Sequence, residues 1–389
     1  MAGLYIHLPF CKSRCIYCAF YSTTQHERMD DYVTALCKEM ELRNTPPSSF
    51  HIPHSTLHTI YLGGGTPSQL PPALLHRLFH NIYKVYEVAT DAEITMECNP
   101  DDITPDYAQV IGELPINRVS MGAQTFSDER LRFLHRRHNS RQVREAVDLL
   151  RQNGIQNISI DLMFGFPGET IQDWEQDIHD ALALDVEHLS AYSLMIEEGT
   201  ELYRRFGSAG VREYENSKEE LEREMYETLI DRLTAAGYEH YEISNFAKKG
   251  CRSRHNSSYW NDTPYIGIGA AAHSYCPPAL HPQGLGKRSW NVADIKAYIE
   301  GMKQGKRLFE EETIDADTHY NDLVTVALRT REGLDLSALS EKHRMYAIKN
   351  ARRFINDGLL ELTDNRLHLT RRGLFVSDMI MTELIIPPR

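Results

Sequence analysis

Six short apolar runs, rich in β-branched residues, alternate with longer amphipathic segments over the first half of the chain. The longer segments carry apolar residues at helical spacing, and several open with Ser, Pro or Thr, which favour helix starts. Strands that alternate with helices in this way predict a parallel sheet. The runs span residues 4–10, 59–62, 93–98, 118–124, 159–164 and 188–195, and the expected helices span residues 29–42, 71–86, 140–153 and 171–184.

Six such units at intervals of roughly 30 residues indicate an α/β fold, an incomplete (β/α)6 barrel. The reactive residues of such a barrel lie at the carboxyl ends of its strands. The chain fits this rule, since Cys11, Gly63, Glu97, Gln124 and Asp161 follow, close or lie within successive apolar runs. We therefore expect these side chains to meet at one end of the barrel.

Cys11, Cys15 and Cys18 are separated by three and then two residues. Thiolates at this spacing can wrap one cubane iron–sulfur cluster, which four cysteines usually hold. Three cysteines leave one iron without a protein ligand, as a cluster that binds a substrate or cofactor requires. Zinc is the alternative, although no fourth Cys or His stands in a paired spacing; His7 and His26 are the nearest histidines.

Composition and charge exclude several classes of protein. The other four cysteines are scattered and no signal-peptide pattern is found, so we expect reduced thiols in a reducing compartment rather than a disulfide framework. The formal charge of −13 argues against nucleic-acid binding. No apolar run approaches the roughly 18 residues of a membrane span. The start at Met1 leaves no room for an organelle presequence, which suggests a bacterial-type cytoplasm with at most peripheral membrane contact.

Three parts are expected along the chain: residues 1–215 as the partial barrel, 216–316 as its extension, and 317–389 as a small winged-helix-like α+β domain. The charge of the last part is nearly balanced, which favours a lid or partner-docking module over a DNA reader. Its expected helices span residues 321–330, 336–343 and 347–357, and its hairpin joins residues 359–363 and 366–370.

Two segments before that domain are also distinctive. Residues 44–58 carry three prolines and three histidines, whose spacing would need a helix that the prolines oppose, so we expect a solvated loop rather than a metal site. Residues 216–236 are expected to form a charged helix, and residues 241–247 to be extended.

Several residues at the expected strand ends suit a small charged ligand. Three consecutive glycines, residues 63–65, let a backbone approach a ligand closely. Glu97 can pair with an ammonium group or with a cation of the barrel itself. Arg136 can bind a carboxylate through its planar fork, and Arg137 is an equal candidate on chemistry alone. Asp161 lies among apolar neighbours, where an unpartnered carboxylate is costly, so we expect it to face a ligand.

The cysteine spacing resembles the signature of the radical S-adenosylmethionine (SAM) superfamily, and the Gly-Gly-Gly-Thr-Pro run resembles its loop for the SAM amino group. With the runs at 97–100, 120–126 and 161–168, nearly the whole chain resembles the family of oxygen-independent coproporphyrinogen III dehydrogenase and its relative, the haem chaperone HemW. The resemblance implies a [4Fe–4S] cluster on the three cysteines and room for two SAM molecules. It implies SAM contacts at Tyr5, Tyr17, Gly64, Gly65, Thr66, Glu97, Gln124, Arg136 and Asp161.

Three features separate the two branches of this family. The dehydrogenase has a further cysteine two residues past the triplet, where this chain has Phe20, and its N-terminal extension is missing here. Residues 254–260 resemble the His-Asn-x-x-Tyr-Trp motif of the HemW branch. That motif implies haem contact by His255, with Tyr259 and Trp260 as an aromatic wall. The alternative is a capped turn in which His255 bonds backbone and Trp260 fills the core.

The function implied is that of a haem chaperone, which binds the cluster, SAM and haem, delivers haem to acceptors such as respiratory enzymes, and in this family can dimerise through the cluster. The alternative is the dehydrogenase, which decarboxylates coproporphyrinogen III, because a carrier would not obviously need the retained SAM residues. Whether the chain is an enzyme therefore stays open. A winged-helix regulator that senses iron or redox state is a third interpretation.

Overall fold

The computed structural model describes residues 2–44, 56–281 and 284–387. Its larger part is built on six consecutive strands that run parallel, each paired with the next in chain order. The expected α/β fold is confirmed, and one of the six strands has the expected bounds. The strands are β1 (Ala2–Leu8), β2 (Leu57–Gly64), β3 (Val88–Cys98), β4 (Arg118–Gln124), β5 (Asn157–Phe164) and β6 (His188–Ser193).

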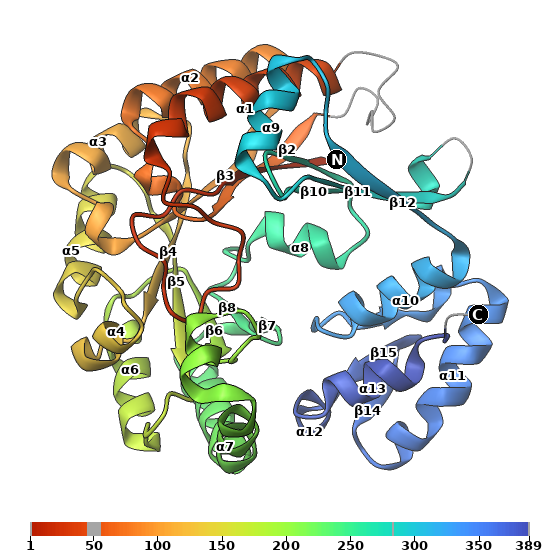
Figure 1. The fold of residues 1–389 in the computed structure, drawn as a ribbon. Coiled ribbons are helices and arrows are strands. Elements are labelled where there is room, and N and C mark those ends of the chain that lie inside the picture. Colours follow the sequence, from red (N-terminus) through yellow and green to blue (C-terminus); the bar gives the residue numbers. More distant parts are fainter. Residues whose placement is uncertain (1, 45–55, 282–283, 388–389) are drawn as a thin grey trace.

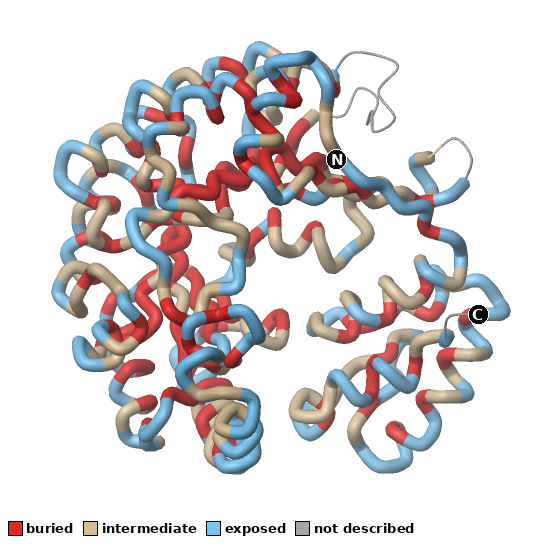
Figure 2. Tube along the Cα trace, in the orientation of Figure 1, coloured by how far each residue is buried: buried red, intermediate tan, exposed pale blue. Residues whose placement is uncertain are grey.

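Helices connect these strands and cover the outer face of the sheet (Figure 1). Two of them begin at capping boxes, where Asn139 and Thr170 each accept a backbone N–H at the start of a helix and a side chain reaches back. Figure 2 shows buried residues concentrated on the strands and the inner faces of the helices. The helices are α1 (Met29–Arg43), α2 (Pro72–Val85), α3 (Pro105–Glu113), α4 (Asp128–Phe133), α5 (Ser140–Gln152), α6 (Ile171–Ala183) and α7 (Glu201–Ala235).

Helix α7 is longer than the charged helix expected from the sequence, which began at residue 216. It starts at Glu201, behind a Thr200 N-cap, and bends at Gly207, whose φ of 66° lies outside the helical region. The expected domain boundary at residues 215 and 216 therefore falls inside α7. Of the proline-rich segment at 44–58, residues 45–55 lie outside the described residues, and 57 and 58 belong to β2.

Six more strands extend the sheet at its two ends. The full order is β12-β11-β10-β9-β1-β2-β3-β4-β5-β6-β8-β7, so that β9 pairs parallel with β1 and the outermost strands pair on one side only within the described ranges. The barrel is thus incomplete. The added elements are β7 (Glu239–Glu242), β8 (Asn245–Ala247), α8 (Arg254–Trp260), β9 (Tyr265–Ile268), β10 (His273–Cys276), β11 (Gly286–Asn291), α9 (Ile295–Lys303) and β12 (Phe309–Ile314).

The C-terminal part has its own apolar core and a three-stranded antiparallel sheet, β13-β15-β14, as the winged-helix-like prediction implied. The expected helix at 336–343 is wrong. Residues Leu336–Ala338 form one 3-10 turn, and Ser340 caps a single helix that includes the expected third helix. The elements are α10 (Ala316–Ala327), β13 (Leu334–Asp335), α11 (Glu341–Asn356), β14 (Leu360–Thr363), β15 (Arg366–Leu369), α12 (Arg371–Leu374) and α13 (Ser377–Leu384).

None of the helices in the described ranges is both long and apolar enough to cross a membrane. All seven cysteines are free thiols, as expected; Cys98 is buried and the other six are partly exposed.

Glu39 of α1 ties the N-terminal helix to the extension of the sheet. Its fully buried carboxylate accepts hydrogen bonds from the Gly269 N–H (2.9 Å) and the Tyr298 hydroxyl (2.7 Å). The guanidinium groups of Arg43 and Arg307 lie 3.5 and 3.4 Å from the same carboxylate. A buried carboxylate with this many partners is satisfied, and removing it leaves two cations without their counter-charge.

We therefore predict that Glu39→Ala lowers the free energy of unfolding by about 3–5 kcal/mol, because it strands buried positive charge. Urea unfolding followed by circular dichroism measures this change. The control is Asp31→Ala on the same helix, where the lost partner is the exposed Lys303, and its effect should stay below about 1 kcal/mol. Equal effects of the two variants would contradict the assigned role of Glu39.

Candidate functional site

A cavity of about 190 Å³ lies at the carboxyl ends of β1 to β5, where the loops after these strands meet. Most residues expected to handle the cluster or SAM line this one cavity, although they come from six separate stretches of sequence. The gathered residues are Cys11, Cys15, Tyr17, Cys18, Gly64, Gly65, Thr66, Glu97, Gln124, Arg136 and Asp161.

The loop that carries the cysteines is held against the barrel by hydrogen bonds to sulfur. The Thr66 hydroxyl donates to Cys11 Sγ at 3.5 Å, and the Arg136 guanidinium donates to Cys15 Sγ at 3.6 Å. Burial raises the pKa of the Cys11 and Cys18 thiols, which favours the neutral form of these two groups when no metal is bound. A bound metal reverses this preference, because coordination deprotonates a thiol.

The donors of this site fit an iron–sulfur cluster. They are soft sulfur ligands, and the positive Arg136 lies beside them to offset the negative charge of bound thiolates. Within the described parts of the chain, no three His, Cys, Asp or Glu side chains are grouped as holders of a single metal ion. The sulfur donors and the adjacent cation thus fit the expected cluster, and zinc stays the alternative.

Ile16, between two of the cysteines, anchors the loop from behind. Its side chain is buried in a small apolar cluster with Leu134, Met163 and Leu194, separate from the main core. The Ile16 N–H donates to the Leu134 carbonyl (3.3 Å), and the Ile16 carbonyl accepts from the Leu202 N–H (2.9 Å). These contacts fix the loop on both sides of one residue, so the spacing of the thiols is set by packing as well as by sequence.

The glycines after β2 are required by close approach. A Cβ on Gly65 would lie 2.6 Å from the carbonyl carbon of Pro9, which belongs to the cysteine loop. Gly64 has a φ of 113°, and a Cβ there would lie 2.5 Å from the ring of His7. Only glycine lets the two loops meet at this distance and leaves backbone groups facing the cavity.

Two carboxylates face the cavity from β3 and β5. Glu97 accepts from the Tyr61 hydroxyl (2.9 Å) and from the Gly64 N–H (3.0 Å). Removal from solvent raises its pKa to about 7 and that of Asp161 to about 6, against the lowering effect of their hydrogen bonds. A cationic ligand in the cavity would favour the charged form of both carboxylates, because it would supply the positive counter-charge.

The structure separates the two arginines that the sequence left equivalent. Arg136 points into the cavity, where it also donates to Asn99 Oδ1 at 2.7 Å. Burial alone would lower the pKa of Arg136, but Tyr17 and Cys15 outweigh this effect and raise it. Arg137 points elsewhere and pairs with two acidic residues, Asp101 at 3.0 Å and Asp102 at 2.9 Å.

Gln124 closes β4 in a left-handed backbone conformation, with a φ of 68°. For a residue other than glycine this conformation is strained, and such strain is often found at functional sites. It coincides with a shift in the pairing register of β4 and β5. No sequence pattern indicated this backbone conformation. Five polar lining residues were also not singled out, although all but Ser22 lay in recognised motif runs: Ser13, Arg14, Ser22, Asn99 and Ser120.

Two expected ligand contacts lie outside this cavity. Tyr5 is turned into the barrel, where its hydroxyl bonds His7 Nδ1 at 3.0 Å and its ring stacks on Tyr61. His255 is fully buried deeper in the barrel, and its ring stacks on both Tyr61 and Tyr5, with centroid distances of 5.1 and 6.4 Å. Neither side chain lines the cavity at the cysteines.

Both ring nitrogens of His255 are engaged within the barrel. Nδ1 bonds Thr59 Oγ1 at 2.8 Å and Nε2 bonds the Tyr259 hydroxyl at 2.9 Å. Burial, with Arg118 nearby, lowers the pKa of His255 to about 3. Ser253 caps α8 in front of it, as the alternative to haem contact expected, but the ring of His255 bonds two side chains and not the backbone that this alternative assumed. Trp260 is only partly buried and faces another cavity.

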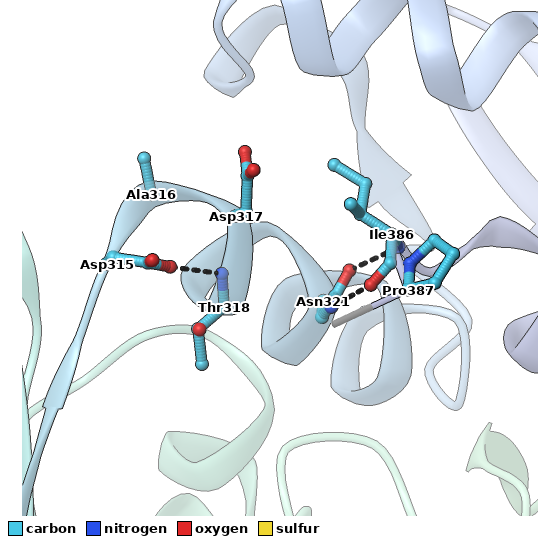
Figure 3. Close-up of a pocket in the computed structure, with 7 residues that line it drawn as sticks. All are labelled: Asp315, Ala316, Asp317, Thr318, Asn321, Ile386 and Pro387. Atoms are coloured by element: carbon cyan, nitrogen blue, oxygen red, sulfur yellow. Dashed lines mark hydrogen bonds between the residues drawn. The ribbon is translucent and has the colours of Figure 1, made fainter. Parts of the chain in front are cut away.

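Another cavity, of about 540 Å³, lies away from the cysteines and the residues around them. It lies at the start of α10 beside the end of the chain (Figure 3). Asp315 caps the helix there, and the amide of Asn321 bonds the Ile386 backbone through both of its ends. These contacts are structural, so we do not assign a ligand to this cavity.

Family models match two parts of the chain. The model described as radical SAM superfamily matches residues 5–181, and the model described as HemN C-terminal domain matches residues 314–376. A solved structure, coproporphyrinogen III oxidase (HemN) from Escherichia coli, shares the fold with a TM-score of 0.80 over 98% of this chain and 89% of that one, at 22% sequence identity. The fold and the cysteine cavity thus define a radical SAM protein.

Sequence comparison narrows this class. The heme chaperone HemW of Bacillus subtilis (strain 168) is 33% identical over 98% of both chains, and that of Escherichia coli (strain K12) is 33% identical over 77% of this chain and 76% of its own. A zebrafish protein, radical S-adenosyl methionine domain-containing protein 1, mitochondrial, is 26% identical over 99% of this chain and 87% of its own. The chain belongs to the HemW family, as its motifs indicated.

We predict that Ile16→Ala at least halves the iron retained per chain after anaerobic reconstitution, because the cysteine loop loses its apolar anchor. Iron and sulfide analysis measures the loss. Ile111→Ala, in the main core on α3, removes the same side chain far from the loop, and both changes should lower stability by about 2–5 kcal/mol. Equal iron contents in the two variants would contradict the anchoring role.

The raised pKa of Glu97 predicts a pH-dependent stability of the ligand-free chain. Its folded value of about 7 exceeds the ordinary 4.5, so between these pH values the folded state holds a proton that the unfolded state has lost. Stability therefore falls as pH rises through this window. Glu97→Gln should remove the part of this fall that Glu97 causes. Relative to the wild type, the free energy of unfolding of the variant should therefore be higher by about 1–2 kcal/mol more at pH 8 than at pH 5.

Urea unfolding of both chains at pH 5 and pH 8 tests this prediction. Glu113→Gln, at the end of α3, is the control and should leave the difference unchanged. A wild-type difference that persists in Glu97→Gln would place the titrating group elsewhere.

Proposed function

We propose that the chain is a haem chaperone, which binds haem and delivers it to haem-dependent proteins. The observation that carries this proposal is the end-to-end similarity to proteins named heme chaperone HemW, at 33% identity over 98% of both chains for the relative from Bacillus subtilis. The proposal has three further parts. The haem acceptors include respiratory enzymes, the chain can form a dimer linked through the cluster, and it is located in the cytoplasm with at most peripheral membrane contact.

The cysteine cavity is proposed to hold a [4Fe–4S] cluster on Cys11, Cys15 and Cys18. When bound, such a cluster supplies an electron and one iron that is open to a ligand. Positive charge from Arg136, 3.6 Å from Cys15 Sγ, supports thiolate binding. We assign the cluster and SAM to residues 1–215. Residues 216–316 carry the α8 segment, and residues 317–389 form the C-terminal module.

SAM is proposed to occupy the same cavity. The carboxylate of Glu97, beside Gly64 and Gly65 on the cavity wall, suits its ammonium group because it can accept charge-assisted hydrogen bonds. The guanidinium of Arg136 suits a carboxylate. Side chains of the remaining lining residues are proposed to contact the rest of the molecule; they are Tyr17, Thr66, Gln124 and Asp161. Tyr5, one layer below, is proposed to support this wall.

A second candidate is radical SAM oxidation of coproporphyrinogen III. The intact cavity at the cysteines favours it, since a carrier has no evident need for buried carboxylates whose pKa values are raised. Against it stands Phe20, whose side chain is 73% exposed beside the cavity where the dehydrogenase motif has a cysteine.

An anaerobic assay separates the two candidates. Cluster-reconstituted protein with reductant, SAM and coproporphyrinogen III should yield no protoporphyrinogen, and the same preparation should bind about one haem per chain. Cys15→Ser, which lacks one proposed cluster ligand, controls for turnover that depends on the cluster. Conversion in the wild type but not in Cys15→Ser would make the chain a dehydrogenase, and failure to bind haem would refute the chaperone function.

A further inference from the structure

A second cavity, of about 430 Å³, lies where the barrel meets the C-terminal domain. One side is formed by β7, α8 and the turn after α8, and the other by α10, β13 and β15. Figure 1 shows α8 and α10 facing each other across this junction, and the two helices are in contact. The volume is typical of a small-molecule site, and such sites are common at domain junctions.

The wall surface of this cavity is mostly apolar, although nine of its sixteen lining residues are polar or charged. Trp260 and Tyr241 lie on the barrel side with their ring centroids 6.1 Å apart, and Leu323, Ala327 and Leu334 lie opposite. A third cavity of about 310 Å³ shares Leu323 with it and is lined by three tyrosines. A flat, mostly apolar molecule suits this shape, because both of its faces would bury against ring and alkyl surface.

One imidazole lines the cavity. Nε2 of His319, on α10, bonds Asp262 Oδ1 at 3.1 Å, and the same oxygen accepts from the Tyr275 hydroxyl. Among the described residues the other nitrogen, Nδ1, has no hydrogen-bond partner. A histidine that gives one N–H to a carboxylate keeps a basic lone pair on its second nitrogen, which is the usual arrangement of a metal-binding imidazole.

Two guanidinium groups line the cavity as well. Arg252 lies over the Tyr241 ring at 5.1 Å and bonds Glu239 and the exposed Glu332. Arg366 bonds Asp335 at 2.6 Å. Carboxylates of a ligand can compete for these donors, because exposed ion pairs contribute little to stability. The cavity thus combines apolar walls, a carboxylate-bound imidazole and two cations.

We propose that this crevice binds the haem cargo, with the His319 imidazole as an axial ligand of its iron, Asp262 as the positioning residue, and Arg252 and Arg366 facing its propionates. The proposal rests on the chaperone function and adds the place of the cargo. His255 differs from His319 in that both of its nitrogens are bonded inside the barrel, so it supports α8 rather than the iron.

Titration of the cluster-loaded full chain with ferric haem and with metal-free protoporphyrin tests the proposal. Absorption difference spectra against the same protein without porphyrin report binding, and electron paramagnetic resonance reports the iron ligands. His319→Gln should weaken haem binding at least tenfold and change the ferric haem signal, yet alter protoporphyrin affinity less than twofold. Leu323→Trp, which fills the cavity and keeps the imidazole, should weaken both porphyrins.

The matched control is His343→Gln. His343 also bonds an aspartate, Asp317, in the C-terminal domain but lines neither cavity, so its haem affinity and spectrum should equal those of the wild type. Wild-type haem affinity and spectrum in His319→Gln would overturn the assignment of the crevice while leaving the chaperone function intact. Absence of haem binding by the wild type would overturn the chaperone function itself.

Discussion

The three cysteines proposed to hold a cluster lie on one loop, half removed from water, and this constraint governs the rest of the structure. Like charges at one loop repel, and burial already favours the neutral thiols at Cys11 and Cys18. The positive charge of Arg136 beside Cys15 offsets this repulsion, and the buried side chain of Ile16 anchors the loop. Arg136 and the residues that pack on Ile16, such as Leu134 and Met163, are far from the cysteines in sequence.

The parallel barrel explains how so many distant residues serve one site. Its strands all end at the same edge, so the loop after each strand contributes one or two groups to the cavity. Glycines after β2 allow the second loop to touch the first, and Glu97 fixes that contact by accepting the Gly64 N–H. At the other end, α8 enters the barrel with His255 bonded to Thr59, which fills the interior below the tyrosines.

Sequence reasoning was strongest where one periodicity or one motif carried the information. It found the six parallel strands, with the exact bounds of β4, and gathered eleven of the residues that line the cysteine cavity. It could not separate Arg136 from Arg137, because adjacent residues with the same chemistry differ only in the direction of their side chains. The sequence also predicted two helices, at 336–343 and 347–357, where the structure has the single helix α11, which begins after the Ser340 cap.

The cavity between α8 and α10 could not be predicted from the sequence, for a different reason. His319 and Asp262 are 57 residues apart, and neither belongs to a recognised motif. Only the docking of the C-terminal domain, through contacts such as Arg329 with Glu242, brings the two side chains together. A site formed by two domains depends on their packing, which local sequence patterns do not encode.

The central claim is that Cys11, Cys15 and Cys18 hold one cluster whose remaining iron is open to SAM in the cavity beside them. Electron paramagnetic resonance of the reduced, reconstituted protein tests it most directly, with spectra recorded before and after addition of SAM. The account predicts a cluster signal that changes shape when SAM is added, and no cluster signal from a chain that lacks the three cysteines. A signal that SAM leaves unchanged, or one that survives loss of the cysteines, would contradict it.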